Sequence, residues 1–138
     1  EGLPPPACAM LISPWTDLTV SGHSIKTLAA IDPIVKKEVL IEFSAMYLNG
    51  ALATTPLASP LYASLHQLPP ILIQVGAAEI LLDDTLRLQS KLKSASINVE
   101  VQVWEKMIHV WHLYAPILDK GAEAIVQLAD YANHHLSY

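Results

Sequence analysis

The placing of three short apolar segments restricts this chain to few folds. The segments ACAMLI at residues 7–12 and ILIQVG at 71–76 are continuous apolar runs bounded by proline or glycine, as expected of strands buried on both faces. The segment NVEVQVWE at 98–105 alternates between valine and mainly polar residues, which is typical of a half-covered strand near a sheet edge. Strands of these two kinds predict a parallel sheet.

The segments between these strands have the period and the end signals of helices. Residues 31–50 form a predicted helix in which Asp32 can act as N-cap, Pro33 takes the first helical position, and Gly50 marks the end. Residues 54–70 contain four prolines without a helical or strand period, so we expect an ordered surface loop there.

Two further helices are predicted at residues 82–95 and 121–136. Either Asp83 or Asp84 can cap the first of them. In the helix at 121–136, four apolar side chains are expected to face the protein interior: Ile125, Leu128, Ala132 and Leu136. The alternation of strands and helices predicts an α/β fold with a parallel sheet that carries helices on both faces.

The number of strands bears on domain organisation. Residues 1–138 read as one partial domain, because three strands make a thin parallel sheet with much uncovered apolar edge. The chain opens as EGLPPP and runs directly into its first predicted strand. We therefore expect the remaining strands of the sheet to come from residues outside this chain.

Charge and apolar run length exclude several classes of function. The net charge is −5 and the chain has only eight lysines and arginines, which argues against nucleic-acid binding. No apolar run approaches the roughly 20 residues that a membrane-spanning helix needs. Cys8 is the single cysteine and cannot form an internal disulfide, so the cytoplasm is the expected compartment.

Acid–base chemistry is expected where two of the predicted strands end. Ligands of open parallel sheets bind beyond the carboxyl ends of the strands. Glu79 follows the strand at 71–76, and His109 follows the strand at 98–105. Neighbouring parallel strands would bring these loops together, and a carboxylate can then orient a histidine that takes a proton from a nucleophile.

Four blocks of the sequence carry a resemblance to a known family. SPWTDLTVSG, YLNG, PLASPLYASLHQLPPILIQVGAAEILLDD and MIHVWHLYAPIL occur in this order over nearly the whole chain. Together they resemble the C-terminal half of a hormone-sensitive-lipase-like carboxylesterase of the α/β-hydrolase superfamily. The resemblance implies that Glu79 is the triad acid and that His109, 30 residues later, is the base.

The chain departs from the family pattern in two ways. The family's acid is more often aspartate than glutamate, and Asp83 or Asp84 would be the alternative acids, although both stand where a helix cap is expected. The chain also lacks the G-x-S-x-G nucleophile elbow and the His-Gly-Gly oxyanion segment, which in the family precede this region. The chain alone is therefore expected to be inactive, and to hydrolyse esters only together with an N-terminal part that carries the serine.

The resemblance also bears on the substrate. It implies a small cap built partly from residues 17–55 and esters of short to medium acyl chains. Ile80 and Val110 flank the two catalytic candidates and are expected either to touch substrate or to pack in the core. No nucleotide or cofactor motif occurs in the chain, so no cofactor is expected.

Two alternatives stay open at this point. Glu79, His109 and His112 could form a metal site of two histidines and a carboxylate, although we expect His112 to be a structural residue, exposed or capping. The chain could also be a non-catalytic α/β module that forms a homodimer through the edge strand at 98–104.

Overall fold

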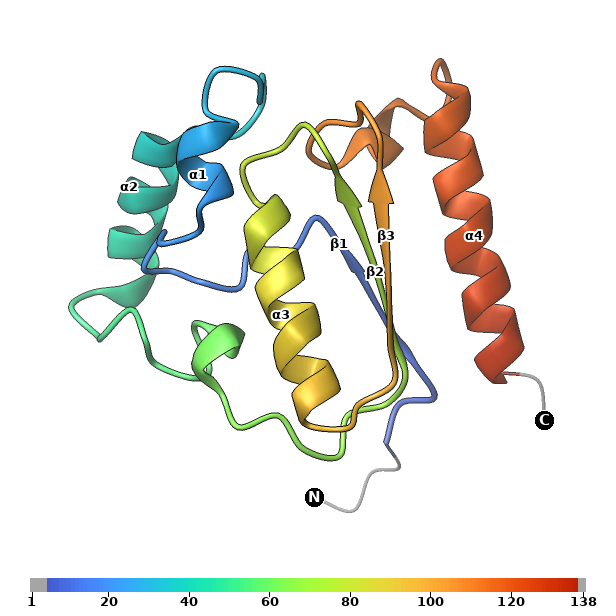
Figure 1. Cartoon of the computed structure of the whole chain (residues 1–138), viewed down its shortest axis with the longest axis horizontal. Coiled ribbons are helices and arrows are strands. Elements are labelled where there is room, and N and C mark those ends of the chain that lie inside the picture. The colour runs from blue at the N-terminus through green and yellow to red at the C-terminus, as the bar shows by residue number, and fades with distance from the viewer. Residues whose placement is uncertain (1–4, 137–138) are drawn as a thin grey trace.

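A computed structural model describes residues 5–136, which form a three-stranded parallel sheet with helices around it (Figure 1). The elements in chain order are β1 (Ala9–Ile12), α1 (Ser24–Thr27), α2 (Lys37–Leu48), a 3-10 turn (Pro60–Tyr62), β2 (Ile71–Gly76), α3 (Leu82–Ser94), β3 (Val99–Trp104), a second 3-10 turn (Trp111–Tyr114) and α4 (Asp119–Leu136). The predicted α/β class and all three predicted strands are confirmed.

The strands lie in the order β1-β2-β3, and both neighbouring pairs are parallel. Ile71 at the start of β2 pairs with Ala9 and with Val99, so the three strands begin and run in step. Every residue of β2 is buried, as its continuous apolar run predicts. Within the described residues β3 is an edge strand, and its pairing with a second copy stays a prediction.

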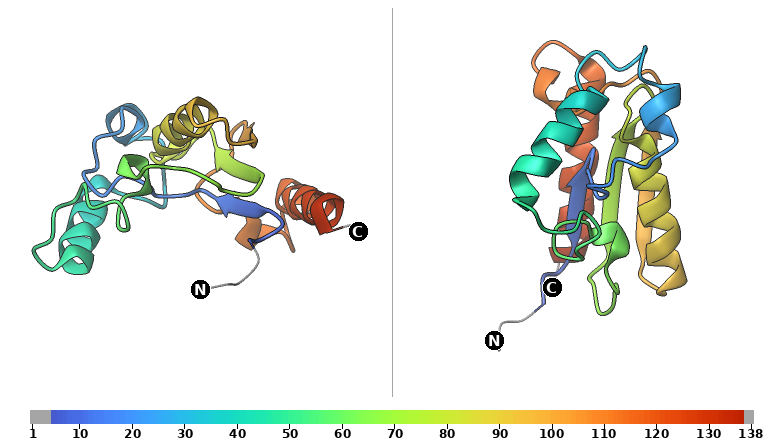
Figure 2. Two further views of the ribbon diagram at one scale, coloured as in Figure 1. Left: turned by 90° about the horizontal axis from the view of Figure 1, so that it is seen from below. Right: turned by 90° about the vertical axis from the view of Figure 1, so that its left-hand side faces the viewer.

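The two faces of the sheet carry different helices, and Figure 2 shows α3 and α4 on opposite sides of the strands. Ile71 and Ile73 point to the α3 face, where Leu88 and Leu92 complete an apolar core. Successive side chains of a strand alternate between faces. Gln74 therefore points the other way, and its amide donates to the carbonyl oxygen of Ala124 in α4 at 3.2 Å.

The helix predicted at 31–50 begins later than expected, at Lys37. Asp32 does not cap it. Oδ1 of Asp32 instead accepts hydrogen bonds from the backbone N–H groups of Ile34 and Val35, at 2.8 and 3.0 Å, which forms a separate turn before the helix. At the other end Asn49 adopts a left-handed conformation, followed by Gly50 with φ of 90°.

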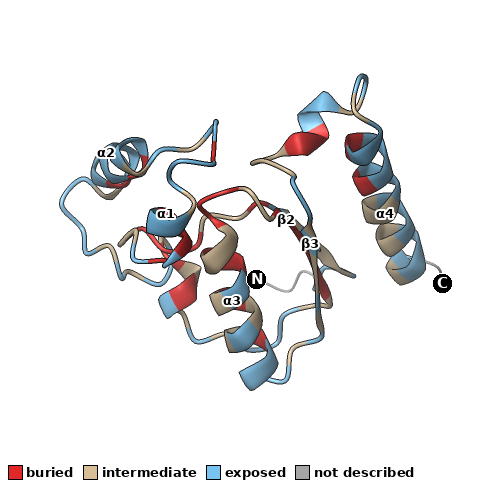
Figure 3. Cartoon of the chain, turned by 45° about the horizontal axis from the view of Figure 1, so that its top comes forward, coloured by how far each residue is buried: buried red, intermediate tan, exposed pale blue. Residues whose placement is uncertain are grey.

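The inward face predicted for the last helix is wrong at two positions. Ile125 and Leu136 are 44% and 53% exposed, whereas Gly121 and Ala124 are buried. Figure 3 shows that the buried residues of α4 lie in its first turns. Small residues face inward there because a Cβ atom on Gly121 would come within 2.9 Å of the Ala115 nitrogen, so the close approach of this helix excludes a larger side chain.

Candidate active site

Glu79 lies in the turn between β2 and α3, and its side chain is completely buried. One carboxylate oxygen, Oε2, accepts a hydrogen bond from the hydroxyl of Ser13 at 2.9 Å. Within residues 5–136 the other oxygen, Oε1, has no hydrogen-bond partner. A buried carboxylate with so few donors is unusual in a structural role, and a site of chemistry is a common reason for one.

His109 lies in the loop after β3 and faces this carboxylate. Its Nδ1 atom is 3.3 Å from Oε2 of Glu79, an ion-pair distance, and its side chain is 23% exposed. The contact is not aligned as a hydrogen bond in the described structure. Hydrogen bonds between catalytic groups are often long or poorly aligned in the absence of substrate. The structure thus brings together the two side chains that the sequence singled out.

A glycine and a strained residue bring the His109 loop against the end of β2. A Cβ atom on Gly76 would lie 2.2 Å from the carbonyl oxygen of Met107, so only glycine allows this approach. The same carbonyl accepts a hydrogen bond from Ala78 N–H at 3.0 Å. Val110, next to His109, has φ of 50°, a conformation that β-branched residues rarely adopt. Such strained backbone is concentrated at functional sites.

Two buried polar residues hold the turn that carries Glu79. Oδ2 of Asp32 accepts the backbone N–H of Ile80 at 2.8 Å, and the hydroxyl of Ser24 donates to the carbonyl oxygen of Ile80 at 2.6 Å. Ser24 also accepts the N–H of Asp83 at 2.9 Å. Both the backbone N–H and the carbonyl oxygen of Ile80, the residue after the acid, are therefore hydrogen-bonded. The sequence did not reveal these roles.

Asp83 and Asp84 do not act as N-caps of α3, whose N-cap residue is Leu81. They lie in the first turn and reach across to the loop after β1. Oδ2 of Asp84 accepts the backbone N–H groups of Thr16 and Asp17 at 2.8 and 2.9 Å. The carboxylate of Asp83 accepts the N–H of His23 at 2.7 Å. Both acids thus fix a loop that lies far from them in sequence, and neither faces His109.

The Asp84 carboxylate has a charged neighbour, Asp17. Burial raises the pKa of Asp17, but hydrogen bonds from Ser21, Thr19 and Arg87 outweigh it and hold that pKa well below its usual range. Burial also raises the pKa of Asp84 to about 6; the N–H of Thr16 opposes this shift and the charge of Asp17 adds to it. Asp84 therefore takes up a proton at a pH where Asp17 stays ionised.

This difference predicts how stability depends on pH. A carboxyl group whose pKa rises from 3.8 to about 6 on folding stabilises the native state fully below pH 3.8, and this contribution is lost as pH rises through 6. The loss corresponds to about 3 kcal/mol. We expect Asp84→Asn to remove this part of the decline in unfolding free energy, measured by chemical denaturation between about pH 4 and pH 7. If the unfolding free energy fell equally with pH in the unsubstituted protein and in Asp84→Asn, the raised pKa of Asp84 would be contradicted.

His112 is separated from His109 by its surroundings. It is buried, it stacks on Trp111 with ring centroids 4.1 Å apart, and its Nε2 lies 2.7 Å from Oε1 of Gln74. Burial lowers the pKa of His112, so the ring is neutral and donates to that oxygen. This packed position agrees with the expected structural role, which stays a prediction, whereas the expected exposure is wrong. No group of three potential metal ligands occurs among residues 5–136, and Glu79, His109 and His112 form none.

An apolar cavity of about 390 Å³ opens beside His109. It lies between Ser13 and His109 on one side and the segment of 34–43 on the other, and Phe43 and Trp15 are its largest lining residues. Its other lining residues are Ile34, Val35, Val39, Leu40 and Leu81. Neither Ile80 nor Val110 lines it. Ile80 is buried in an apolar cluster with Ile25 and Leu40, and Val110 is half-buried.

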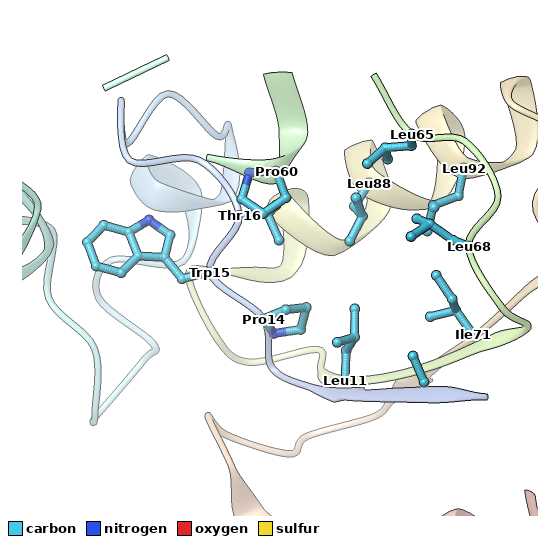
Figure 4. Close-up of a pocket in the computed structure, with 11 residues that line it drawn as sticks. Leu11, Pro14, Trp15, Thr16, Pro60, Leu65, Leu68, Ile71, Leu88 and Leu92 are labelled. Atoms are coloured by element: carbon cyan, nitrogen blue, oxygen red, sulfur yellow. The ribbon is translucent and has the colours of Figure 1, made fainter. Parts of the chain in front are cut away.

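A second apolar cavity, of about 380 Å³, lies on the α3 side of the sheet (Figure 4). Leu11 and Ile71 from the strands, Leu88 and Leu92 from α3, and two leucines of the loop before β2 line it. His109 and Glu79 do not. Of these two cavities, only the one beside His109 is lined by a member of the Glu79–His109 pair. Separately, no helix within residues 5–136 has the length and apolar character needed to cross a membrane.

Comparison with known proteins gives one family. A model described as alpha/beta hydrolase fold matches residues 1–113. An acetyl-hydrolase of Streptomyces hygroscopicus is 42% identical over 124 residues, which are 90% of this chain and 42% of that protein. An esterase of Acinetobacter venetianus is 30% identical over 92% of this chain and 42% of its own length.

Solved structures agree with this result. A crystal structure of EstE5 is similar with a TM-score of 0.96 and 44% identity, over 99% of this chain and 46% of that one. An esterase from the bacterial hormone-sensitive lipase family has a TM-score of 0.96 and 43% identity over the same shares. The chain thus spans less than half the length of the relatives that it matches.

Proposed function

The chain belongs to the α/β hydrolase fold family and resembles hormone-sensitive-lipase-like esterases over their C-terminal half, and on this premise we propose that it supplies the acid and the base of a serine-hydrolase triad. Glu79 is the proposed acid and His109 the proposed base. The observation that carries the proposal is the 3.3 Å approach of Nδ1 of His109 to the buried carboxylate of Glu79. This is the pairing that a triad requires between acid and base.

The proposed nucleophile is a serine in a segment that precedes this chain in the same polypeptide. The chain has no G-x-S-x-G elbow, and its relatives are about twice its length. The edge of the sheet at β1 supports this arrangement, because Met10 and Ile12 are 41% and 37% exposed and β1 pairs with β2 on one side only. A parallel strand added beside β1 would pair with its free edge and bring its carboxyl end close to Ser13 and His109, and the helix that follows such a strand would cover the face on which Met10 and Ile12 lie.

Each nitrogen of His109 has its own task in the proposed triad. Because Nδ1 faces Glu79, Nε2 at the far side of the ring is the atom that takes the proton of the serine hydroxyl. The serine oxygen then bonds to the ester carbonyl carbon, and the alcohol leaves with the proton that Nε2 returns. A water molecule then gives a proton to Nε2 as its oxygen bonds to the acyl carbon. The serine oxygen leaves with that proton, which releases the carboxylic acid and restores the serine. Glu79 orients the imidazole ring and stabilises the imidazolium that forms.

Esters with short to medium acyl chains are the proposed substrates. The cavity of about 390 Å³ beside His109 is lined mainly by apolar side chains, and its size suits a small acyl or alcohol group. Five of its lining residues lie between 34 and 43, which supports a cap built partly from residues 17–55. The Streptomyces relative is an acetyl-hydrolase, and one EstE5 crystal was soaked with p-nitrophenyl butyrate. Leu81, which lines the cavity, replaces Ile80 as the proposed substrate contact. Val110 does not line the cavity, and its backbone N–H donates to the hydroxyl of Ser13.

The proposal is tested with the polypeptide read from the complete gene, called here the full-length polypeptide, beside the 138-residue chain. The full-length polypeptide is expected to hydrolyse p-nitrophenyl butyrate and to react with a fluorophosphonate, which modifies activated serines. The chain alone is expected to do neither. Hydrolysis by the chain alone at the rate of the full-length polypeptide would overturn the division of the triad.

A further inference from the structure

Ser13 stands at the end of β1 with features that the sequence did not reveal. It is 3% exposed, and its backbone N–H donates to the carbonyl oxygen of Gln74 at 2.8 Å, which continues the pairing of β1 with β2 by one residue. Its φ is 46°, a left-handed conformation that serine seldom adopts. A turn of this kind directs the side chain away from its position in a regular strand.

The hydroxyl of Ser13 connects the ends of all three strands. It donates to Oε2 of Glu79, which follows β2, at 2.9 Å. It accepts the backbone N–H of Val110, which follows β3, at 3.2 Å. Oε2 is the same oxygen that Nδ1 of His109 approaches. One hydroxyl therefore fixes the rotamer of the acid and the strained turn beside the base.

We propose that Ser13 is a positioning residue that holds Glu79 and His109 in the orientation needed for proton transfer. The inference rests on the proposed triad and adds a fourth member to it, which acts through its hydrogen bonds to the acid and to the base loop. Buried catalytic groups need supporting hydrogen bonds, because a small displacement of an acid or base lowers the rate sharply. Glu79 needs this support more than most acids, since Ser13 is its hydrogen-bond donor in the described structure.

Ser13 is not itself suited to be the nucleophile. Its hydroxyl proton is directed at the carboxylate of Glu79, and its oxygen accepts the N–H of Val110, so both roles of the hydroxyl are taken. Pro14 follows it, and the chain then continues as a loop to Ser24, whereas a nucleophile elbow leads from a strand directly into a helix.

The test uses two substitutions of Ser13 in the full-length polypeptide. Ser13→Ala removes the hydroxyl and keeps a side chain at positive φ, whereas Ser13→Gly removes the hydroxyl and relieves the backbone. Both are expected to lower kcat for p-nitrophenyl butyrate by about tenfold to hundredfold with KM unchanged, as for loss of a hydrogen bond to a charged group. Both are also expected to shift the NMR signal of the His109 imidazole N–H proton.

Ser59→Ala is the matched control. Ser59 is also completely buried, and its hydroxyl donates to Ala53 at 2.6 Å and accepts the N–H of Leu18 at 2.8 Å. This variant should lose stability while kcat and the His109 signal stay the same.

The outcomes separate this inference from the proposed function. A Ser13→Gly protein that folds and keeps full kcat would overturn the role of Ser13 alone, provided that His109→Ala is inactive. Activity restored in Ser13→Gly but lost in Ser13→Ala would also overturn it, because backbone strain would then be the cause. If His109→Ala retained activity, the proposed triad would fail together with the inference.

Discussion

Replacing His109 with alanine is expected to lower kcat of the full-length polypeptide for p-nitrophenyl butyrate by roughly 10³-fold or more. The imidazole is the proposed general base in both half-reactions, and within residues 5–136 no other histidine faces Glu79. KM is expected to change little, because His109 contributes only a small part of the cavity lining. Initial rates over a range of ester concentrations measure both constants.

His112→Ala is the matched control for this experiment. It removes a histidine three residues away that is buried against Trp111 and bonded to Gln74. We expect a loss of about 1 to 3 kcal/mol in unfolding free energy, since Oε1 of Gln74 loses its donor, while kcat of the folded protein stays within a fewfold. Inactivation by His112→Ala together with normal rates for His109→Ala would show that the base is assigned to the wrong histidine.

Glu79→Gln is expected to lower kcat by about 10²- to 10⁴-fold while leaving the fold intact. The amide has nearly the shape of the carboxylate, and its oxygen can still face Ser13 and Nδ1 of His109, which both approach Oε2, but the neutral amide carries no charge that stabilises an imidazolium. Glu79→Asp should show a smaller loss, because its shorter side chain draws the carboxylate back from both partners. Steady-state kinetics of the full-length variants measure these losses.

The two acids that follow Glu79 in the sequence serve as controls. Asp83→Asn and Asp84→Asn change the anchoring of the loop after β1, and neither carboxylate lies against His109. Both variants should therefore keep kcat within a fewfold at the same pH. A loss in either that equals the loss in Glu79→Gln would move the acid to that residue.

The arrangement of Glu79 and His109 could be predicted because it depends on regular structure. The apolar run of β2 and the alternation in β3 indicate parallel strands, and neighbouring parallel strands end at the same edge of the sheet. The approach of two loops separated by 30 residues follows from that topology alone. The expectation that further strands come from outside this chain rests on the same pattern, because three strands make a thin parallel sheet.

The supporting polar contacts could not be predicted, because each joins a side chain to a distant segment. Ser13 meets Glu79 across 66 residues of sequence, and Asp84 meets Thr16 across 68. A short polar residue near a helix start has the same local pattern whether it caps that helix or holds another loop. The sequence therefore predicts caps at Asp32 and at Asp83 or Asp84, which the structure does not show. The buried face of α4 differs from the predicted one for a related reason. The helix approaches its neighbours closely at its first turns, so the small residues Gly121 and Ala124 are buried there instead of larger apolar residues.

The site of covalent modification by a fluorophosphonate tests the division of the triad most directly. The full-length polypeptide is treated with the reagent, and the modified residue is identified by mass spectrometry of its peptides, in parallel with His109→Ala and His112→Ala. We expect one modified serine, N-terminal to residue 1 of this chain, with modification lost in His109→Ala and kept in His112→Ala. Modification of a serine within residues 1–138, or modification that does not depend on His109, would contradict it.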